Sequence, residues 1–274
     1  MPLNITLTIP LILKGLYESL GLYNKCNRSY DSRVQSQWAS SVDVPRNPQL
    51  VVRDTAAALG SADRKKTKDD IDTINIPFQK RIIHITDQLE GNYETNGDSL
   101  RAFTADVVRA FERDFNNLCA NEALANAVAV GGAAVKPWAA NELQYADLNK
   151  INQYFDGLEV PKEERVVIID NDVADQFKNI DVVKSAVAFN KDLLEKGVAV
   201  IDNVTYMISA NLNKVNGKPA LVGLWTKALA FIIKKHMDRK EVWDTEETVT
   251  HVDFIGYVAK KVTYTEGSMA LVRP

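Results

Sequence analysis

The stretch of sequence that decides the fold is SLRAFTADVVRAFERDFNNLCANEAL, residues 99–124. Its apolar residues recur at intervals of three and four, which is the spacing of one face of an α-helix. They are Leu100, Phe103, Val107, Phe111, Phe115 and Leu118. Gly97, Asp98 and Ser99 place a helix breaker and a capping side chain ahead of this pattern. Since no proline interrupts it, the stretch predicts a helix roughly 35 Å long, about twice the ordinary length.

The composition is that of a globular protein with a sizeable core. The chain has 274 residues, of which 46% are hydrophobic and 25% are charged, and its formal net charge is −3. This length accommodates one large or two modest domains. The charge is too small to indicate an acidic tail or a nucleic-acid-binding surface. No apolar run is long enough to predict a membrane span, and Pro10 and Lys14 interrupt the N-terminal apolar run that a signal peptide would need.

The two cysteines, Cys26 and Cys119, suggest neither a disulfide framework nor a metal-binding motif. Cys119 lies beside the apolar face of the long helix, so we predict a small core residue there rather than a reactive thiol. These features indicate a reducing, cytoplasmic setting.

The first 90 residues predict two segments that cannot form a core alone. Residues 1–36 predict an arm: an extended start, a short amphipathic helix and a polar stretch. Residues 37–90 predict an extended hairpin, in which residues 71–89 return as one long strand. Pro45, Pro48 and Pro77 favour an edge or an isolated ribbon over a central strand. Both segments must therefore pack on the rest of the chain or on a neighbour.

The charged tip of this hairpin has two interpretations. Arg64, Lys65, Lys66 and Lys68 lie beside Asp63, Asp69 and Asp70. The run is either a solvated tip or a set of ion pairs with a neighbouring subunit, and the sequence does not decide between them.

The second half of the chain predicts an α/β domain and a closing β segment. Helices are predicted over 143–155 and 182–194, with a buried strand at Arg165–Asp170 between them. Paired strands follow over 197–212, with turns at Asn216-Gly217 and Glu266-Gly267. Residues 225–236 are apolar but fit neither period.

Most catalytic motifs are missing from the sequence. It contains no phosphate-binding loop, dinucleotide fingerprint, nucleophile elbow or HExxH motif. His84, His236 and His251 are widely separated, and we interpret them as structural or surface residues. Asp202-Asn203 is favourable turn chemistry rather than a metal site.

Asp170 and Asp172 are the best candidates for catalysis. A strand that ends in Asp-x-Asp is similar to the nucleophile loop of haloacid-dehalogenase-type phosphatases, in which the carboxylates hold Mg²⁺. That family places Thr or Val where this chain has Ala174. An aspartate that caps the following helix explains the same residues with one ordinary hydrogen bond, and we favour this interpretation.

The order of the predicted parts resembles the major capsid protein of tailed bacteriophages, the Hong Kong 97-type fold that encapsulin shells share. Residues 160–169, VPKEERVVII, are similar to the opening of the family's axial domain. Residues 197–204 resemble its strand pair, with Asn203 in place of the second glycine. Residues 253–262 and 269–272 resemble its closing strand and its usual ending, although Gly256-Tyr257 reverses the commoner order.

The resemblance implies an α+β fold with five parts. These are an N-terminal arm (1–36), an extended loop or E-loop (37–90), a peripheral domain with the long spine helix (91–138), an axial α/β domain (139–240) and a return to the peripheral domain (241–274). It implies a structural subunit without enzyme activity, cofactor or metal, which forms hexamers and pentamers of an icosahedral head around double-stranded DNA. The implied contact residues between subunits are Leu13, Leu16, Tyr17, Arg64, Lys65, Lys66 and Lys68.

The resemblance also implies the partners and the location. The chain would assemble with itself in the host cytoplasm, work with portal, scaffolding and cementing proteins, and reside in the virion without contacting a membrane. Packaged DNA would be held non-specifically. Two alternatives stay open: an encapsulin-type shell protein, and a Mg²⁺-dependent phosphohydrolase that uses Asp170 and Asp172.

Overall fold

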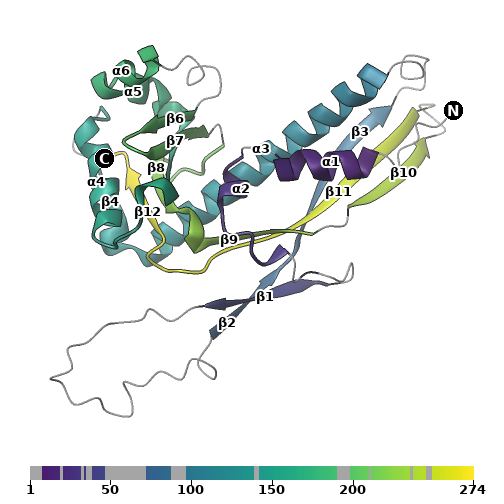
Figure 1. Ribbon diagram of the computed structural model, residues 1–274, viewed down its shortest axis with the longest axis horizontal. Coiled ribbons are helices and arrows are strands. Elements are labelled where there is room, and N and C mark those ends of the chain that lie inside the picture. The colour runs from purple at the N-terminus through teal and green to yellow at the C-terminus, as the bar shows by residue number, and fades with distance from the viewer. Residues whose placement is uncertain are drawn as a thin grey trace, which may run out of the picture.

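A single long helix, α3, runs through most of the molecule and connects its two ends (Figure 1). The computed structural model describes residues 8–18, 21–31, 34, 39–46, 72–87, 97–138, 142–189, 198–209, 211–234, 237–244 and 249–274. Helix α3 spans Gly97–Val130, 34 residues, and so continues beyond the predicted end near Leu124. It ends where Gly131 and Gly132 adopt positive φ angles of 63° and 54°, which glycine tolerates best.

A six-stranded mixed sheet lies at one end of α3, in the order β4-β12-β8-β5-β7-β6. Its strands are β4 (Val135–Pro137), β5 (Arg165–Asp170), β6 (Val198–Ile201), β7 (Val204–Ser209), β8 (Ala220–Trp225) and β12 (Ser268–Val272). All six residues of β5 are buried. Val166 and Ile168 pack in the core that includes α3, and Val167 and Ile169 pack in a second core with α4. The sheet is therefore covered on both faces, as its continuous apolar strand indicates.

Short helices cover the face of this sheet that α3 leaves free. They are α4 (Tyr145–Asp156), η5 (Lys162–Glu164), η6 (Asn171–Val173), α5 (Ala174–Asn179) and α6 (Asp181–Phe189). Helix α4 approaches β8 closely, because a Cβ atom added at Gly223 would lie 2.3 Å from Ile151 Cγ2. The predicted turns are confirmed: Asp202 and Asn203, and Asn216 and Gly217, all have positive φ angles.

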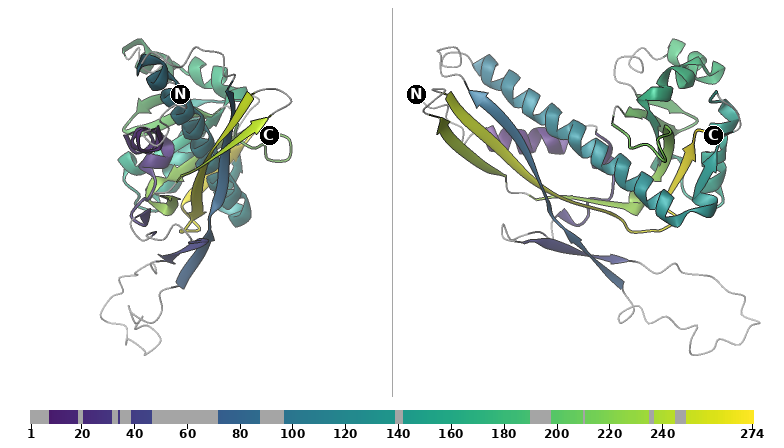
Figure 2. Two further views of the ribbon diagram at one scale, coloured as in Figure 1. Left: turned by 90° about the vertical axis from the view of Figure 1, so that its right-hand side faces the viewer. Right: turned by 180° about the vertical axis from the view of Figure 1, so that it is seen from behind.

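The second sheet, which is antiparallel, lies along the other part of α3 (Figure 2). It consists of β3 (Gln79–Asp87), β9 (Leu229–Ile233), β10 (Asp238–Asp244) and β11 (Val249–Val262), and β11 pairs with the other three. Val252 and Phe254 of β11 share a core with Phe111 and Phe115 of α3. The stretch 225–236, which fitted neither period, begins at the end of β8 and continues, in its described part, through the 3-10 turn η7 (Thr226–Ala228) into β9. β8 and β9 belong to different sheets.

The predicted hairpin forms, but its return limb divides at Phe78. β1 (Ser41–Arg46) pairs antiparallel with β2 (Asp72–Pro77), while β3 leaves this ribbon and pairs with β11. Val42, Val44 and Ile76 of the ribbon pack on Ala230, Ile232 and Ala259 beneath it. The base of the ribbon is therefore packed against β9 and β11 of the same chain. Residues 47–71, including the predicted tip, lie outside the described residues.

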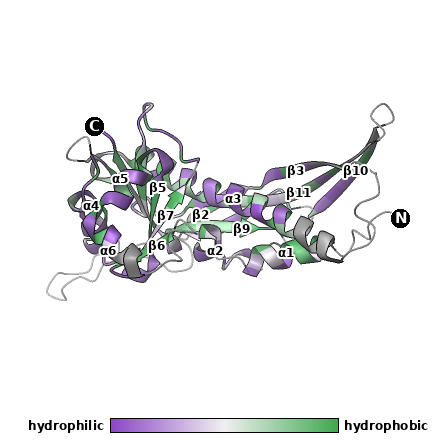
Figure 3. Cartoon of the chain, turned by 90° about the horizontal axis from the view of Figure 1, so that it is seen from above, coloured by the Kyte–Doolittle hydropathy of each residue, from purple (hydrophilic) through white to green (hydrophobic). Residues whose placement is uncertain are grey.

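The arm helices α1 (Thr8–Glu18) and α2 (Leu22–Lys25) pack on α3. Figure 3 shows α1 beside α3 and the strands of the second sheet, with hydrophilic and hydrophobic residues mixed along α3. Among the described residues, no helix combines the length and apolar character that crossing a membrane requires.

Candidate assembly surface

Arm helix α1 places the three predicted arm contacts in different environments. Leu16 is only 1% exposed and lies in the chain's own core with Val107 and Phe111. Leu13 is partly buried against the same core, whereas Tyr17 is 39% exposed. The prediction that Leu16 contacts a neighbour is therefore corrected: its apolar surface is already covered by α3 of the same subunit. Leu13 and Tyr17 keep surface that a neighbour can reach.

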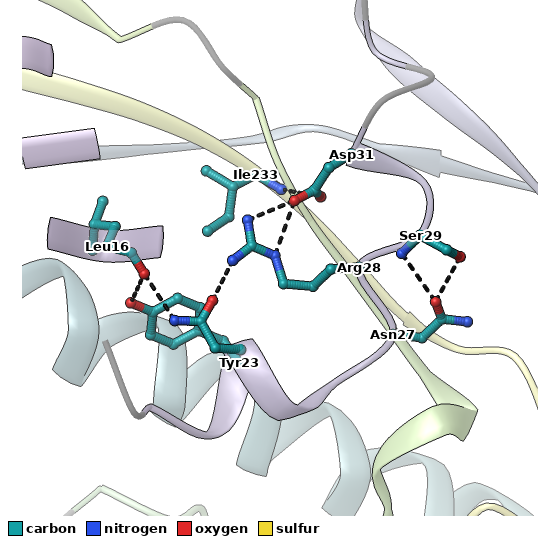
Figure 4. A network of polar contacts seen from close by, with 8 residues as sticks. Leu16, Tyr23, Asn27, Arg28, Ser29, Asp31 and Ile233 are labelled. Carbon is teal, nitrogen blue, oxygen red and sulfur yellow. Dashed lines mark hydrogen bonds and ion pairs between the residues drawn. The ribbon is translucent and has the colours of Figure 1, made fainter. Parts of the chain in front are cut away.

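A network of hydrogen bonds connects α1 to the arm residues that follow it in the sequence (Figure 4). The Tyr23 hydroxyl and the Asn24 side-chain amide both donate to the carbonyl oxygen of Leu16, at 2.8 Å each. The Arg28 guanidinium donates to Asp31 Oδ2 at 2.9 Å through Nε and also to Asn24 Oδ1. The same guanidinium lies 4.4 Å from the Tyr17 ring centroid. Arg28 therefore connects Tyr17 of α1 with Asp31, which follows α2 in the arm.

The arm also completes the free edge of β9. Asn27 donates its backbone N–H to the Leu229 carbonyl at 2.9 Å and accepts from the Phe231 N–H at 3.1 Å. Further along, Asp31 Oδ1 accepts from the Ile233 N–H at 3.2 Å. These bonds satisfy backbone groups that would otherwise be buried without partners. Asn27 thus forms a single parallel bridge with Ala230 at this edge, and the Asp31 side chain caps the edge further along.

Burial raises the pKa of Tyr17, and the negative charge of Asp31 acts in the same direction. Arg28 opposes both effects through its charge and its hydrogen bond with the Tyr17 side chain. The neutral phenol is therefore the form that the docked arm favours.

A groove of about 430 Å³ lies between α1 and α3. It is lined by Leu11, Lys14, Gly15 and Glu18 of α1 and by Thr104, Ala105, Val108 and Arg109 of α3. Leu11 is 46% exposed, although it belongs to a helix whose other face is in the core. Leu11 is not among the predicted contact residues, because helical spacing alone does not separate the rim of an apolar face from its centre.

The second sheet carries exposed apolar residues on the face turned away from α3. Ile82 of β3 and Val242 of β10 are 51% and 58% exposed. His84 Nδ1 lies 2.6 Å from Asp253 Oδ1, and its ring stacks on that of His251 with centroids 5.1 Å apart. The register places Asp253 opposite His84 and His251 opposite Val242. Two histidines far apart in sequence are therefore neighbours on this surface.

Asp170 and Asp172 are arranged as a helix cap. Asp170 Oδ1 accepts from the Asp172 N–H at 3.1 Å and precedes η6, as the capping interpretation predicted. Asp172 Oδ2 lies 2.6 Å from Lys214 Nζ. Within the described residues, no group of three or more His, Cys, Asp or Glu side chains is placed to hold a metal ion. Nothing in this part of the chain points to catalysis.

The predicted loop contacts Arg64, Lys65, Lys66 and Lys68 lie outside the described residues. Within the described residues, the candidate assembly surface has four parts. They are the exposed side of α1, the groove between α1 and α3, the exposed face of the second sheet and the base of the ribbon. Its exposed apolar residues are the kind that subunit interfaces cover.

Solved phage structures share this fold over nearly the whole chain. A chain of Mycobacterium phage Che8 matches with a TM-score of 0.58 and 15% identity, over 91% of this chain and 90% of that one. The capsid of Ralstonia phage GP4 matches with a TM-score of 0.59 and 11% identity, over 93% and 88%. The procapsid of satellite phage P4 matches with a TM-score of 0.56 and 10% identity, over 100% and 91%.

No protein-family model matches the sequence, and no curated protein is significantly similar to it. At 10–15% identity, the likeness to the phage structures concerns the fold. The phage-capsid resemblance inferred from the sequence is confirmed at that level.

Proposed function

We propose that this chain, which has a phage-capsid fold, is the major capsid protein of a tailed bacteriophage, a structural subunit that assembles with itself. The observation that carries the proposal is the extent of the shared fold. The match takes in 91% of this chain and 90% of the Che8 chain, so both proteins use the whole architecture rather than one common motif. An enzyme that had borrowed only the α/β part would match over that part alone.

The subunits form hexamers and pentamers of an icosahedral shell that encloses double-stranded DNA. Closed rings of identical contacts build such capsomers, and small differences in hinge angle allow one chain to occupy both. The exposed side of α1, the ribbon and the loop beyond it are the contact regions. Within them, Leu13, Tyr17, Arg64, Lys65, Lys66 and Lys68 are the residues that touch neighbouring copies.

The five parts implied by the resemblance are our proposed ranges along the chain, and the strands β3, β4, β9 and β12 pair across them. The arm is 1–36, the E-loop 37–90, the spine-helix region 91–138, the axial domain 139–240 and the return 241–274. β3 of the E-loop range pairs with β11 of the return, while β1 and β2 form a separate two-stranded ribbon.

Portal, scaffolding and cementing proteins are the expected further partners, and DNA is held without sequence preference. The net charge of −3 suits an inner wall that does not grip DNA strongly. The subunit is assembled in the host cytoplasm and resides in the virion. We propose no cofactor and no reaction for this subunit. Asp170 accepts a capping hydrogen bond and Asp172 pairs with Lys214, which supports structural roles for both.

Deletion of residues 57–68 tests the role of the loop. We expect the full-length chain to sediment as particles or capsomers, and the deletion variant to give failed or fragile shells while its body stays folded by circular dichroism. Asp170→Asn is the matched control, because asparagine also caps helices well and should leave assembly intact. Intact particles from the deletion variant would refute the assigned role of the loop.

A further inference from the structure

Two of the chain's three histidines, His84 and His251, lie side by side on the exposed face of the second sheet. They come from the adjacent antiparallel strands β3 and β11, in which Asp253 is paired with His84. His251 precedes Asp253 by two positions, so both side chains lie on the same face of β11. The two ring centroids are 5.1 Å apart, and the ring planes differ by 28°. The strand register, rather than a local motif, creates this pair.

The carboxylate of Asp253 decides how His84 is presented. His84 Nδ1 lies 2.6 Å from Asp253 Oδ1, and the His84 side chain is 58% exposed. Since an ionised carboxylate only accepts hydrogen bonds, Nδ1 is the donor, and in the neutral ring the lone pair is then on Nε2. Histidines that bind metals almost always donate their other ring nitrogen to such a partner. His84 is therefore presented in the way that a metal ligand is presented.

The spacing of the two rings fits a single metal ion. Zinc–nitrogen bonds are about 2.0–2.1 Å long, so two imidazoles on one tetrahedral zinc ion have ring centroids about 5 Å apart. The observed separation is 5.1 Å. Val252 and Phe254, the neighbours of Asp253 in β11, lie in the core on the other face. The histidine face is therefore open to an ion from solvent, and binding there leaves the core unchanged.

We propose that His84 and His251 bind one Zn²⁺ ion on the surface of the second sheet, with Asp253 orienting His84. Imidazole is a ligand that suits this cation. Waters complete the coordination, because no group of three or more His, Cys, Asp or Glu side chains in the described part of the chain is placed to hold an ion. The site does not depend on the proposed function, since one chain contains both ligands.

The ion is structural rather than a cofactor of a reaction. It joins β3, which follows the ribbon, to β11, with which the other three strands of this sheet pair. An ion that binds the folded sheet and not the unfolded chain stabilises the sheet in proportion to its occupancy. Zn²⁺ should therefore restrict the opening of β3 away from β11.

Isothermal titration of Zn²⁺ into the full-length chain without an affinity tag tests the site. We expect saturable binding of one ion per chain, reversed by EDTA. His84→Ala and His251→Ala should each abolish the saturable binding. Asp253→Asn keeps both ligands and should weaken binding about 10–100-fold, as loss of an orienting carboxylate typically does. His236→Ala is the matched control, because it removes the remaining histidine of the chain and should leave binding unchanged.

Hydrogen exchange of the same samples locates the ion. Zn²⁺ should slow amide exchange in β3 and β11 and leave the six-stranded sheet unchanged. Circular dichroism checks each variant, and His84→Gln replaces His84→Ala if the alanine variant is unfolded.

Three results would overturn the proposal. They are the absence of saturable binding, binding that survives both histidine-to-alanine changes, and a ratio of one ion to two chains. The titration uses unassembled chain, so a chain that binds Zn²⁺ in this way but never assembles would support the site while refuting the proposed function. Shells built from a chain without saturable binding would do the reverse.

Discussion

Truncation of Leu16 to alanine should destabilise the subunit itself, before any assembly. Leu16 is fully buried between α1 and α3, so the change removes apolar contacts that the isolated chain already makes. The transfer term is about 0.8 kcal/mol for each carbon group removed, and cavity formation brings typical buried Leu→Ala costs to about 2–5 kcal/mol. We expect a loss in this range in the free energy of unfolding.

Leu11→Ala is the matched control, because it makes the same chemical change in the same helix. Leu11 is 46% exposed and lines the groove rather than the core. Alanine and leucine both favour helix, so helix propensity contributes little to either variant. We expect Leu11→Ala to cost less than about 1 kcal/mol in subunit stability.

Urea unfolding of the unassembled subunit, followed by tryptophan fluorescence, measures both variants. The reasoning is refuted if Leu16→Ala and Leu11→Ala cost the same, or if Leu16→Ala impairs assembly without changing subunit stability. The second result would mean that Leu16 meets a neighbour, as the sequence first suggested, and that the arm docks in trans.

Two further pairs of substitutions test other parts of the fold by thermal or chemical unfolding, and a pH series tests the arm by proteolysis. Gly223→Val should cost about 1–3 kcal/mol by overpacking α4 against β8, whereas Gly157→Ala, whose Cβ would come no closer than 3.5 Å to another atom, should be nearly neutral. Arg165 is buried, donates to the carbonyl oxygens of Val160 and Asn152 and pairs with Asp156. Arg165→Met removes all of these contacts and should cost about 1–3 kcal/mol. Lys162→Met, which breaks only an exposed ion pair, should cost under about 1 kcal/mol, so equal losses for the last two would contradict this account. Because the folded chain raises the pKa of Tyr17, arm docking should be complete below pH 10.0 and weaken as the pH rises above it. Proteolysis of the arm should report this loosening, and an unchanged pH profile in Tyr17→Phe would exclude this tyrosine as its cause.

The apolar spacing in the sequence predicted the long helix α3 and its buried face, because both depend on residues close together in the chain. The apolar spacing identified Val107, Phe111 and Phe115 as the buried face of α3, and all three are buried. The helix continues past Leu124 because residues 125–130 are mostly alanine and valine, with no breaker before Gly131. Alanine has the highest helix propensity, so the sequence itself carries the signal for the longer helix.

Hydrophobic periodicity does not predict which strands pair when they lie far apart in the sequence. β2 and β3 have similar alternation and follow one another, so nothing local shows that the ribbon ends at Pro77 and that β3 joins β11. The same limit applies to the candidate surface. Helical periodicity indicates that the Leu16 side chain is buried. It does not indicate whether α3 of the same chain or a neighbouring subunit buries it. The Arg28 network arises only after the arm has docked.

Electron microscopy of the purified full-length chain, with light scattering on the same sample, tests the central claim most directly. The account predicts uniform shells, tubes or capsomer rings, with a scattering mass many times that of the 30.5 kDa chain. A folded chain that stays monomeric across a range of protein and salt concentrations would contradict it. Mg²⁺-dependent hydrolysis of a phosphate ester by that monomer, lost in Asp170→Asn, would replace the shell with the phosphohydrolase alternative.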